Sequence, residues 1–89
     1  MKVLKGIRVL DFTTLLPGPL ATLMLVDAGA EVIKVEKKGG EDLRKIGPFI
    51  KGNSILFSVL NRGKKSLELD LKDKKNIKKI LKLIKDIDV

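Results

Sequence analysis

The chain has 89 residues, a length that suits one small domain or part of a larger one. Its 44% hydrophobic and 34% charged residues are typical of a globular protein and exclude a disordered chain. The sequence has no cysteine and no histidine, which excludes a disulfide framework, a thiolate metal site and a histidine general base. No metal site is predicted.

No apolar run is long enough to span a bilayer, and the first residues lack the layout of a signal peptide. We therefore expect no membrane partner and a cytoplasmic location. The formal net charge of +8 raises the alternative of nucleic-acid binding, because lysines that neutralise phosphates supply affinity for any base sequence. The lysines concentrate toward the C-terminal end, and no tyrosine or tryptophan is present for base stacking. A solvated helix face explains the charge better, so no nucleic-acid partner is predicted.

The first half of the chain has the pattern of a β-α-β unit. Residues 7–12 (IRVLDF) form an apolar run whose length suits a buried strand, and a proline-glycine turn ends it. A helix is predicted to begin at Pro19; it is apolar nearly all round and is expected to be buried, with Gly29 as its left-handed C-cap. Residues 30–37 (AEVIKVEK) predict a second strand. At these lengths the two strands are expected to be parallel, with a right-handed crossover.

The middle of the chain predicts shorter elements. One helical turn is expected at residues 43–46, and a short helix is expected at residues 54–61 with Ser54 or Asn53 as its N-cap. Residues 66–71 (SLELDL) alternate apolar and acidic residues, as a strand with one wet face would.

Residues 72–85 predict the last helix, with Asp73 near its N-terminus where the helix dipole favours an acid. Lysines fill most of its surface, which is typical of a solvated amphipathic helix. A membrane-surface helix is the alternative, but the apolar stripe lacks interfacial aromatics. Residues 87–89 look like the first residues of another strand, so we expect the chain to end within an element. The expected core stripe of the helix is Ile77, Ile80, Leu81 and Ile84.

These elements predict an α/β fold: a Rossmann-like β-α-β segment with parallel strands, as an incomplete part of a larger domain. Glu36 occupies the place at the end of the second strand where an acid would hold a ribose hydroxyl in a dinucleotide-binding fold. The turn after the first strand reads LLPGP instead of GxGxxG, and Pro19 removes an N–H that would bind phosphate. An ordinary NAD site is therefore not expected.

Two separated motifs carry a resemblance to a known family. The first covers residues 4–49, from LKGIRVLDF to KIGPF, and the second covers residues 61–72 (NRGKKSLELDLK). In this order and spacing, the chain resembles the N-terminus of the class III coenzyme A transferases. That family includes formyl-CoA:oxalate CoA-transferase, carnitine CoA-transferase and the α-methylacyl-CoA racemases. The resemblance covers essentially the whole chain, so residues 1–89 are expected to form the N-terminal segment of a CoA-transferase family III domain.

The resemblance implies that the complete enzyme transfers coenzyme A from an acyl-CoA to a free carboxylic acid, as an interlocked homodimer. The implied partners are the acyl-CoA and carboxylate substrates and either a second copy or the missing C-terminal part of the enzyme. In the family, the catalytic residue is an aspartate that forms an anhydride and then a CoA thioester. That aspartate lies downstream of this stretch, so no catalytic residue is assigned and this chain alone is expected to be inactive.

The resemblance also implies which residues contact coenzyme A. Lys37, just past the second strand, would meet the phosphorylated ribose, with Lys38 beside it. Lys72 would contact a phosphate. Many relatives carry arginine in place of Lys37; lysine keeps the charge but not the bidentate geometry. The residues implied to bind the cofactor are Leu15, Leu16, Pro17, Lys37, Leu69, Asp70, Leu71 and Lys72.

Each assignment has a simpler alternative. Leu15 and Leu16 would only pack the helix. Lys37 and Lys38 would be ordinary solvated loop lysines, and Lys72 would simply flank a helix. Asp11 has the look of a catalytic carboxylate on a buried strand, but we expect it to accept hydrogen bonds from the turn after that strand.

Two other functions stay open. One is an acyl-CoA racemase of the same family, whose acid and base would also lie beyond residue 89. The other is a non-catalytic basic protein that binds nucleic acid or a partner protein. The acyl donor and the acceptor are not readable from the sequence.

Overall fold

The computed structural model describes residues 2–89. Its main sheet has three parallel strands in the order β1-β2-β5, with Val9 opposite Val32 and Val35 opposite Leu67. The expected α/β fold with parallel strands is confirmed. The bounds of the strands are Arg8–Asp11 for β1, Glu31–Glu36 for β2 and Lys65–Glu68 for β5.

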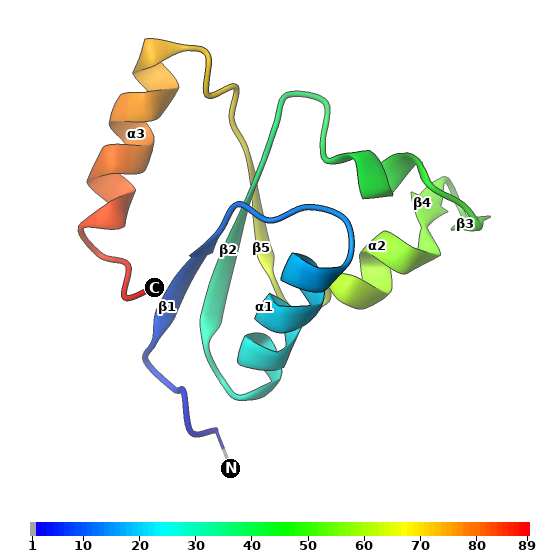
Figure 1. Cartoon of the computed structure of the whole chain (residues 1–89), viewed down its shortest axis with the longest axis horizontal. Coiled ribbons are helices and arrows are strands. Elements are labelled where there is room, and N and C mark those ends of the chain that lie inside the picture. The colour runs from blue at the N-terminus through cyan, green and yellow to red at the C-terminus, as the bar shows by residue number, and fades with distance from the viewer. Residues whose placement is uncertain (1) are drawn as a thin grey trace.

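The two faces of this sheet carry separate apolar clusters. On one face, Val9 and Val32 pack with Leu25 and Val26 of helix α1 (Pro17–Asp27). On the other face, Val35 and Leu69 pack with Ile80 of helix α3 (Lys74–Ile84), together with partly buried Leu10 and Leu67. Figure 1 shows the sheet between α3 on one side and α1 on the other. The sheet is therefore covered on both faces, as expected for parallel strands.

The connection from β2 to β5 contains a short 3-10 helix, η1 (Asp42–Lys45), and a hairpin of β3 (Phe49–Ile50) and β4 (Asn53–Ser54). The hairpin was not predicted, because two residues per strand are too few to show a pattern. Helix α2 (Ile55–Leu60) follows, and the Ser54 hydroxyl accepts a hydrogen bond from the Phe57 N–H at 3.2 Å. The predicted N-cap at Ser54 is confirmed.

Several element ends differ from the predictions for local reasons. Helix α1 begins at Pro17, two residues before the predicted start, since proline suits the first turn of a helix. Strand β5 ends at Glu68 instead of residue 71, because the Asp70 carboxylate accepts the Lys72 N–H at 3.0 Å and turns the chain toward α3. Gly29 has a φ of 104°, which confirms the left-handed residue after α1.

The expectation that α1 is buried all round is wrong. Its buried residues are Pro19, Thr22 and Leu23, whereas Leu20 and Met24 are 40% and 62% exposed. The sheet and α2 contact α1 on other sides, and Leu20 and Met24 lie on the side that stays exposed. None of the helices in the described part of the chain has the length and apolar character needed to cross a membrane.

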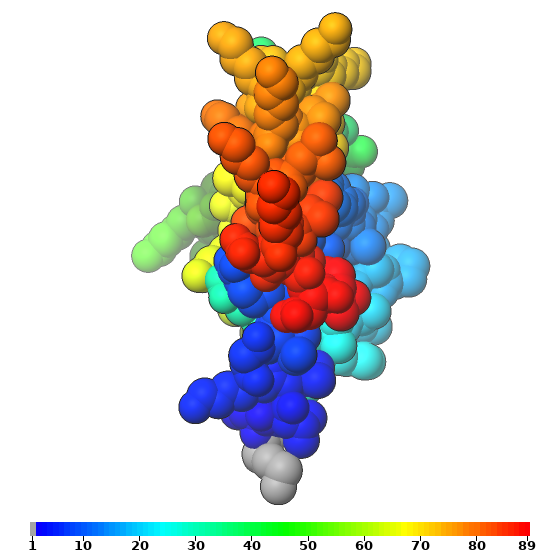
Figure 2. Space-filling model, turned by 90° about the vertical axis from the view of Figure 1, so that its left-hand side faces the viewer, coloured from blue at the N-terminus to red at the C-terminus, as the bar shows by residue number. Residues whose placement is uncertain are grey.

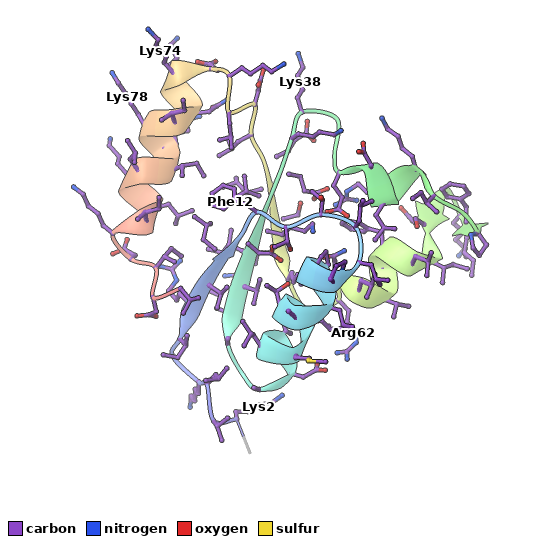
Figure 3. All side chains as sticks on the ribbon, in the orientation of Figure 1. Lys2, Phe12, Lys38, Arg62, Lys74 and Lys78 are labelled. Carbon is purple, nitrogen blue, oxygen red and sulfur yellow. The ribbon has the colours of Figure 1, made fainter. Side chains whose placement is uncertain are left out.

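Helix α3 is also less buried than predicted. Of its apolar stripe only Ile80 is buried, while Ile77 and Leu81 are 42% and 57% exposed. Figure 2 shows α3 running along this side of the molecule with its long side chains fanning outward. Lys74 and Lys78 point away from the sheet in Figure 3.

The last residues lie beside β1. The N–H groups of Asp88 and Val89 donate to the Arg8 carbonyl at 2.9 and 3.2 Å, and the Leu10 N–H donates to the Val89 carbonyl at 2.9 Å. This alternation is the hydrogen-bond pattern of a parallel ladder. The connection through α1 leads from β1 to β2 on one side of β1, and the connection through α3 leads to residues 88–89 on its other side. Ligands of open α/β sheets commonly bind where the strand order reverses in this way.

The Asp73→Ala variant is expected to lower the free energy of unfolding by about 1 kcal/mol, because the Lys75 N–H loses the carboxylate that caps α3. The matched control is Asp86→Ala, which removes the same charge just past the other end of α3, where the helix dipole disfavours an acid. Its stability should be unchanged or slightly higher. Urea unfolding followed by far-UV circular dichroism measures both, and equal losses would contradict the capping role of Asp73.

Candidate functional site

A pocket of about 450 Å³ opens at the carboxyl ends of the three parallel strands. Its wall comes from Phe12 and Thr14 after β1, from Glu36 and Lys37 at the end of β2, and from residues 69–72 after β5. Figure 3 shows Phe12 where β1 ends, between α1 and α3. Ligands of open α/β sheets bind outside this edge, so the pocket is the candidate site.

The pocket brings together five of the eight residues implied to contact coenzyme A. These five are Lys37, Leu69, Asp70, Leu71 and Lys72. The other three do not line the pocket: Leu15 and Leu16 lie in the turn before α1, and Pro17 is the first residue of α1. Leu15 and Leu16 are 45% and 57% exposed, so part of each side chain is accessible to a ligand.

Two lysines stand at the pocket, and neither is tightly held. The Lys37 ammonium lies 2.6 Å from the Asp42 carboxylate, but both side chains are largely exposed. Such a pair contributes at most about 1 kcal/mol, so a competing anion displaces it readily. Within residues 2–89, Lys72 makes no ion pair. Both ammonium groups are therefore available to a negatively charged ligand, while Lys38 points outward from the loop (Figure 3).

Glu36 is fully occupied by protein partners. Its two carboxylate oxygens receive Arg44 Nε at 2.6 Å and Arg44 Nη2 at 2.7 Å, and they also accept from the Ser66 hydroxyl and the Glu41 N–H. The Arg44 guanidinium, with Ser66 and the Glu41 amide, overcomes the effect of burial and lowers the pKa of Glu36 to about 2. Four hydrogen bonds use the acceptor capacity of a carboxylate. Glu36 therefore has none left for a ribose hydroxyl.

Sequence reasoning identified Glu36 but missed Arg44. The arginine follows eight residues later in a loop of mixed charge, and nothing in that local pattern indicates its partner. The guanidinium carbon of Arg44 also lies 3.8 Å from the centre of the Phe57 ring, so α2 contacts Arg44 as well.

Asp11 accepts hydrogen bonds from the Thr13 N–H at 2.7 Å and from the Thr13 and Thr22 hydroxyls. The expectation that it bonds the turn after its own strand is confirmed. Burial by itself raises the pKa of Asp11, but the bonds from Thr13 and Thr22 outweigh it and keep that pKa below the ordinary value. The side chain is buried beside Lys64 at 3.3 Å. Asp11 therefore positions the turn and is not poised as a general base.

A second buried ion pair supports the pocket wall. Lys34 Nζ lies 2.6 Å from Glu41 Oε2, and each side chain is only 1% exposed. Lys34 also donates to the Thr13 carbonyl at 3.0 Å, and Glu41 accepts the Leu15 N–H at 3.3 Å. The pair thus joins β2, the turn before α1 and the loop after β2.

Among residues 2–89 no group of acidic side chains is arranged to hold a metal ion.

The sequence pattern of CoA-transferase family III matches residues 4–89 of this chain. The succinyl-CoA:glutarate CoA-transferase of Mus musculus is 46% identical, over 100% of this chain and 21% of that enzyme. The acetyl-CoA:oxalate CoA-transferase of Acetobacter aceti is 42% identical, over 94% of this chain and 22% of that enzyme.

A crystal structure of a hypothetical protein from Mycobacterium tuberculosis has the same fold over this region. It matches with a TM-score of 0.90 and 48% identity, over 99% of this chain and 24% of that one. The chain therefore spans about a quarter of the length of its relatives and matches the N-terminal part of the larger structure. The names of the two relatives differ in acyl donor and in acceptor, so the shared region does not identify either substrate.

The stability of the chain is expected to fall as the pH drops from about 4.5 to about 2. Glu36 has a pKa of about 2 in the folded chain and an ordinary value of 4.5, so its ion pair stabilises the fold above pH 4.5 and is lost as the pH falls through the folded pKa. A shift of this size corresponds to about 3 kcal/mol. Urea unfolding between pH 7 and pH 2 measures it. Glu36→Gln should flatten this dependence, and a variant that keeps the full dependence would contradict the assignment.

Proposed function

Since the chain belongs to CoA-transferase family III, we propose that it supplies part of the coenzyme A site of an enzyme that moves coenzyme A from an acyl-CoA to a carboxylic acid. The observation that carries this proposal is that Lys37 and Lys72 line one pocket at the carboxyl edge of the sheet. Coenzyme A bears a ribose phosphate and a pyrophosphate, and ammonium groups at the end of parallel strands suit such a polyanion.

In the proposed complex, Lys37 contacts the phosphorylated ribose and Lys72 contacts a phosphate. The apolar side chains of Phe12 and Leu69 offer a surface for the adenine ring, since both line the same pocket. Leu71 and Asp70 complete this wall. Leu15, Leu16 and Pro17 lie outside the pocket, and we place the rest of the coenzyme A molecule along that exposed turn.

We further propose that residues 1–89 are the N-terminal segment of a family III domain whose catalytic aspartate lies outside them. The chain spans 21–24% of the relatives described above. The outer face of α1 exposes Leu20 and Met24, and α3 exposes Ile77 and Leu81. Apolar side chains exposed on two helices support a further polypeptide packing here. That polypeptide is the remaining part of the enzyme or a second copy.

Coenzyme A should bind saturably to the 89-residue chain, and Lys37→Glu or Lys72→Glu should weaken binding by roughly tenfold or more, because reversal replaces an attraction by a repulsion. Isothermal titration calorimetry measures the affinity. The matched controls are Lys38→Glu and Lys78→Glu, which change the net charge equally but do not line the pocket.

The controls should keep most of the affinity. Equal losses in all four variants would indicate diffuse attraction to a basic surface, and no saturable binding by the parent chain would overturn the proposed site.

The 89-residue chain alone should not transfer coenzyme A, because Asp11 is buried and fully hydrogen-bonded and the family's catalytic aspartate is assigned elsewhere. The assay incubates the chain with succinyl-CoA and glutarate, or with acetyl-CoA and oxalate, and separates the thioesters by liquid chromatography. Product formed above the uncatalysed background would contradict this assignment.

A further inference from the structure

Three carboxylates stand in the wall of a pocket that is proposed to bind a polyanion: Glu36, Glu41 and Asp70. An uncompensated carboxylate would repel a phosphate there. Glu36 and Glu41 are each compensated by a cation that does not line the pocket, since Arg44 pairs with Glu36 and Lys34 pairs with Glu41. The charges of these two glutamates are therefore cancelled, and a ligand meets the charges of Lys37, Lys72 and Asp70.

We propose that Arg44 is a positioning residue that makes this pocket selective for coenzyme A with a phosphorylated ribose over the same molecule without that phosphate. Arg44 acts through Glu36, whose carboxylate it holds by two hydrogen bonds. The inference rests on the proposed coenzyme A site and names the residue that sets its specificity.

The chemistry follows from what Glu36 would do without its partner. A free carboxylate at the end of the second parallel strand accepts hydrogen bonds from ribose hydroxyls and so favours an unphosphorylated ribose. A phosphate ester replaces a hydroxyl donor by a dianion, which the same carboxylate repels. In this chain the Glu36 oxygens already accept four hydrogen bonds from Arg44, Ser66 and the Glu41 amide. Glu36 therefore offers the ligand neither an acceptor nor an unbalanced charge.

Glu36 is an anion in the paired state. The Arg44 guanidinium, with Ser66 and the Glu41 amide, holds the pKa of Glu36 at about 2, so at neutral pH the carboxylate is ionised and the guanidinium compensates its charge. The Phe57 ring lies 3.8 Å from the guanidinium carbon and keeps it facing Glu36. The Arg44 side chain is 41% exposed, so replacing it with methionine leaves no enclosed cavity and retains packing on the ring.

The test compares coenzyme A with 3′-dephospho-coenzyme A by calorimetry on the 89-residue chain. The parent should prefer coenzyme A. In Arg44→Met, the affinity for coenzyme A should fall roughly tenfold while that for the dephosphorylated molecule is kept or rises, because Glu36 becomes an uncompensated acceptor. A tenfold change in the ratio of the two affinities corresponds to about 1.4 kcal/mol.

The double variant Arg44→Met with Glu36→Gln should restore the preference for coenzyme A over 3′-dephospho-coenzyme A, because the unpaired carboxylate charge is gone. The matched control is Lys45→Met, which removes a neighbouring cation of η1 that makes no ion pair with Glu36. It should leave the ratio unchanged. Circular dichroism checks the fold of each variant. If Arg44→Met fails to fold, Arg44→Lys keeps a cation without the bidentate geometry and should lower the ratio about threefold.

The outcomes separate the two proposals. Binding of neither molecule by the parent chain overturns the proposed coenzyme A site and this inference with it. Binding of both, with an affinity ratio that Arg44 variants do not change or that Glu36→Gln does not restore, overturns only the role of Arg44. A ratio that falls in Arg44→Met and returns in the double variant supports it.

Discussion

Buried carboxylates at the carboxyl end of the parallel sheet need cations from other segments, and the rest of the structure depends on that compensation. Where both partners of an ion pair are buried, as they are for Lys34 and Lys64 with their carboxylates, removing one partner costs about 3–5 kcal/mol because it leaves an uncompensated charge. Because the cations come from β2, from η1 and from the residues before β5, the pairs connect the loops that surround the pocket. The three pairs are Asp11 with Lys64, Glu41 with Lys34, and Glu36 with Arg44.

This compensation also explains what kind of ligand the site suits. A dinucleotide-binding fold uses a free acid after its second strand and a glycine-rich turn after its first. Here Glu36 is paired with Arg44, the first turn of α1 carries two prolines in place of a glycine-rich turn, and Lys37 and Lys72 lie beyond the ends of β2 and β5. The same architecture therefore places the Lys37 and Lys72 ammonium groups around a pocket in which protein cations compensate Glu36 and Glu41. That arrangement agrees with membership of CoA-transferase family III and with the proposed binding of a phosphorylated nucleotide.

The sequence predicted the order and type of the main elements, because strand-length apolar runs and helical periodicity are local signals. It did not predict the exposed sides of α1 and α3, since an apolar helix surface is compatible with burial against this sheet or against a further polypeptide. The ionic network was also missed. Lys34 looked like an ordinary strand residue, yet it is buried against Glu41, and Lys64 meets a carboxylate 53 residues earlier. Such pairings depend on tertiary contacts that no local pattern records.

The central claim is that coenzyme A binds at the carboxyl edge of the sheet through Lys37 and Lys72. A crystal structure of the 89-residue chain with coenzyme A tests it most directly. We predict the ribose phosphate within hydrogen-bond distance of the Lys37 ammonium, a second phosphate near Lys72, and Arg44 still paired with Glu36. Coenzyme A bound along the lysines of α3, or a ribose hydroxyl bonded to Glu36 with Arg44 displaced, would contradict it.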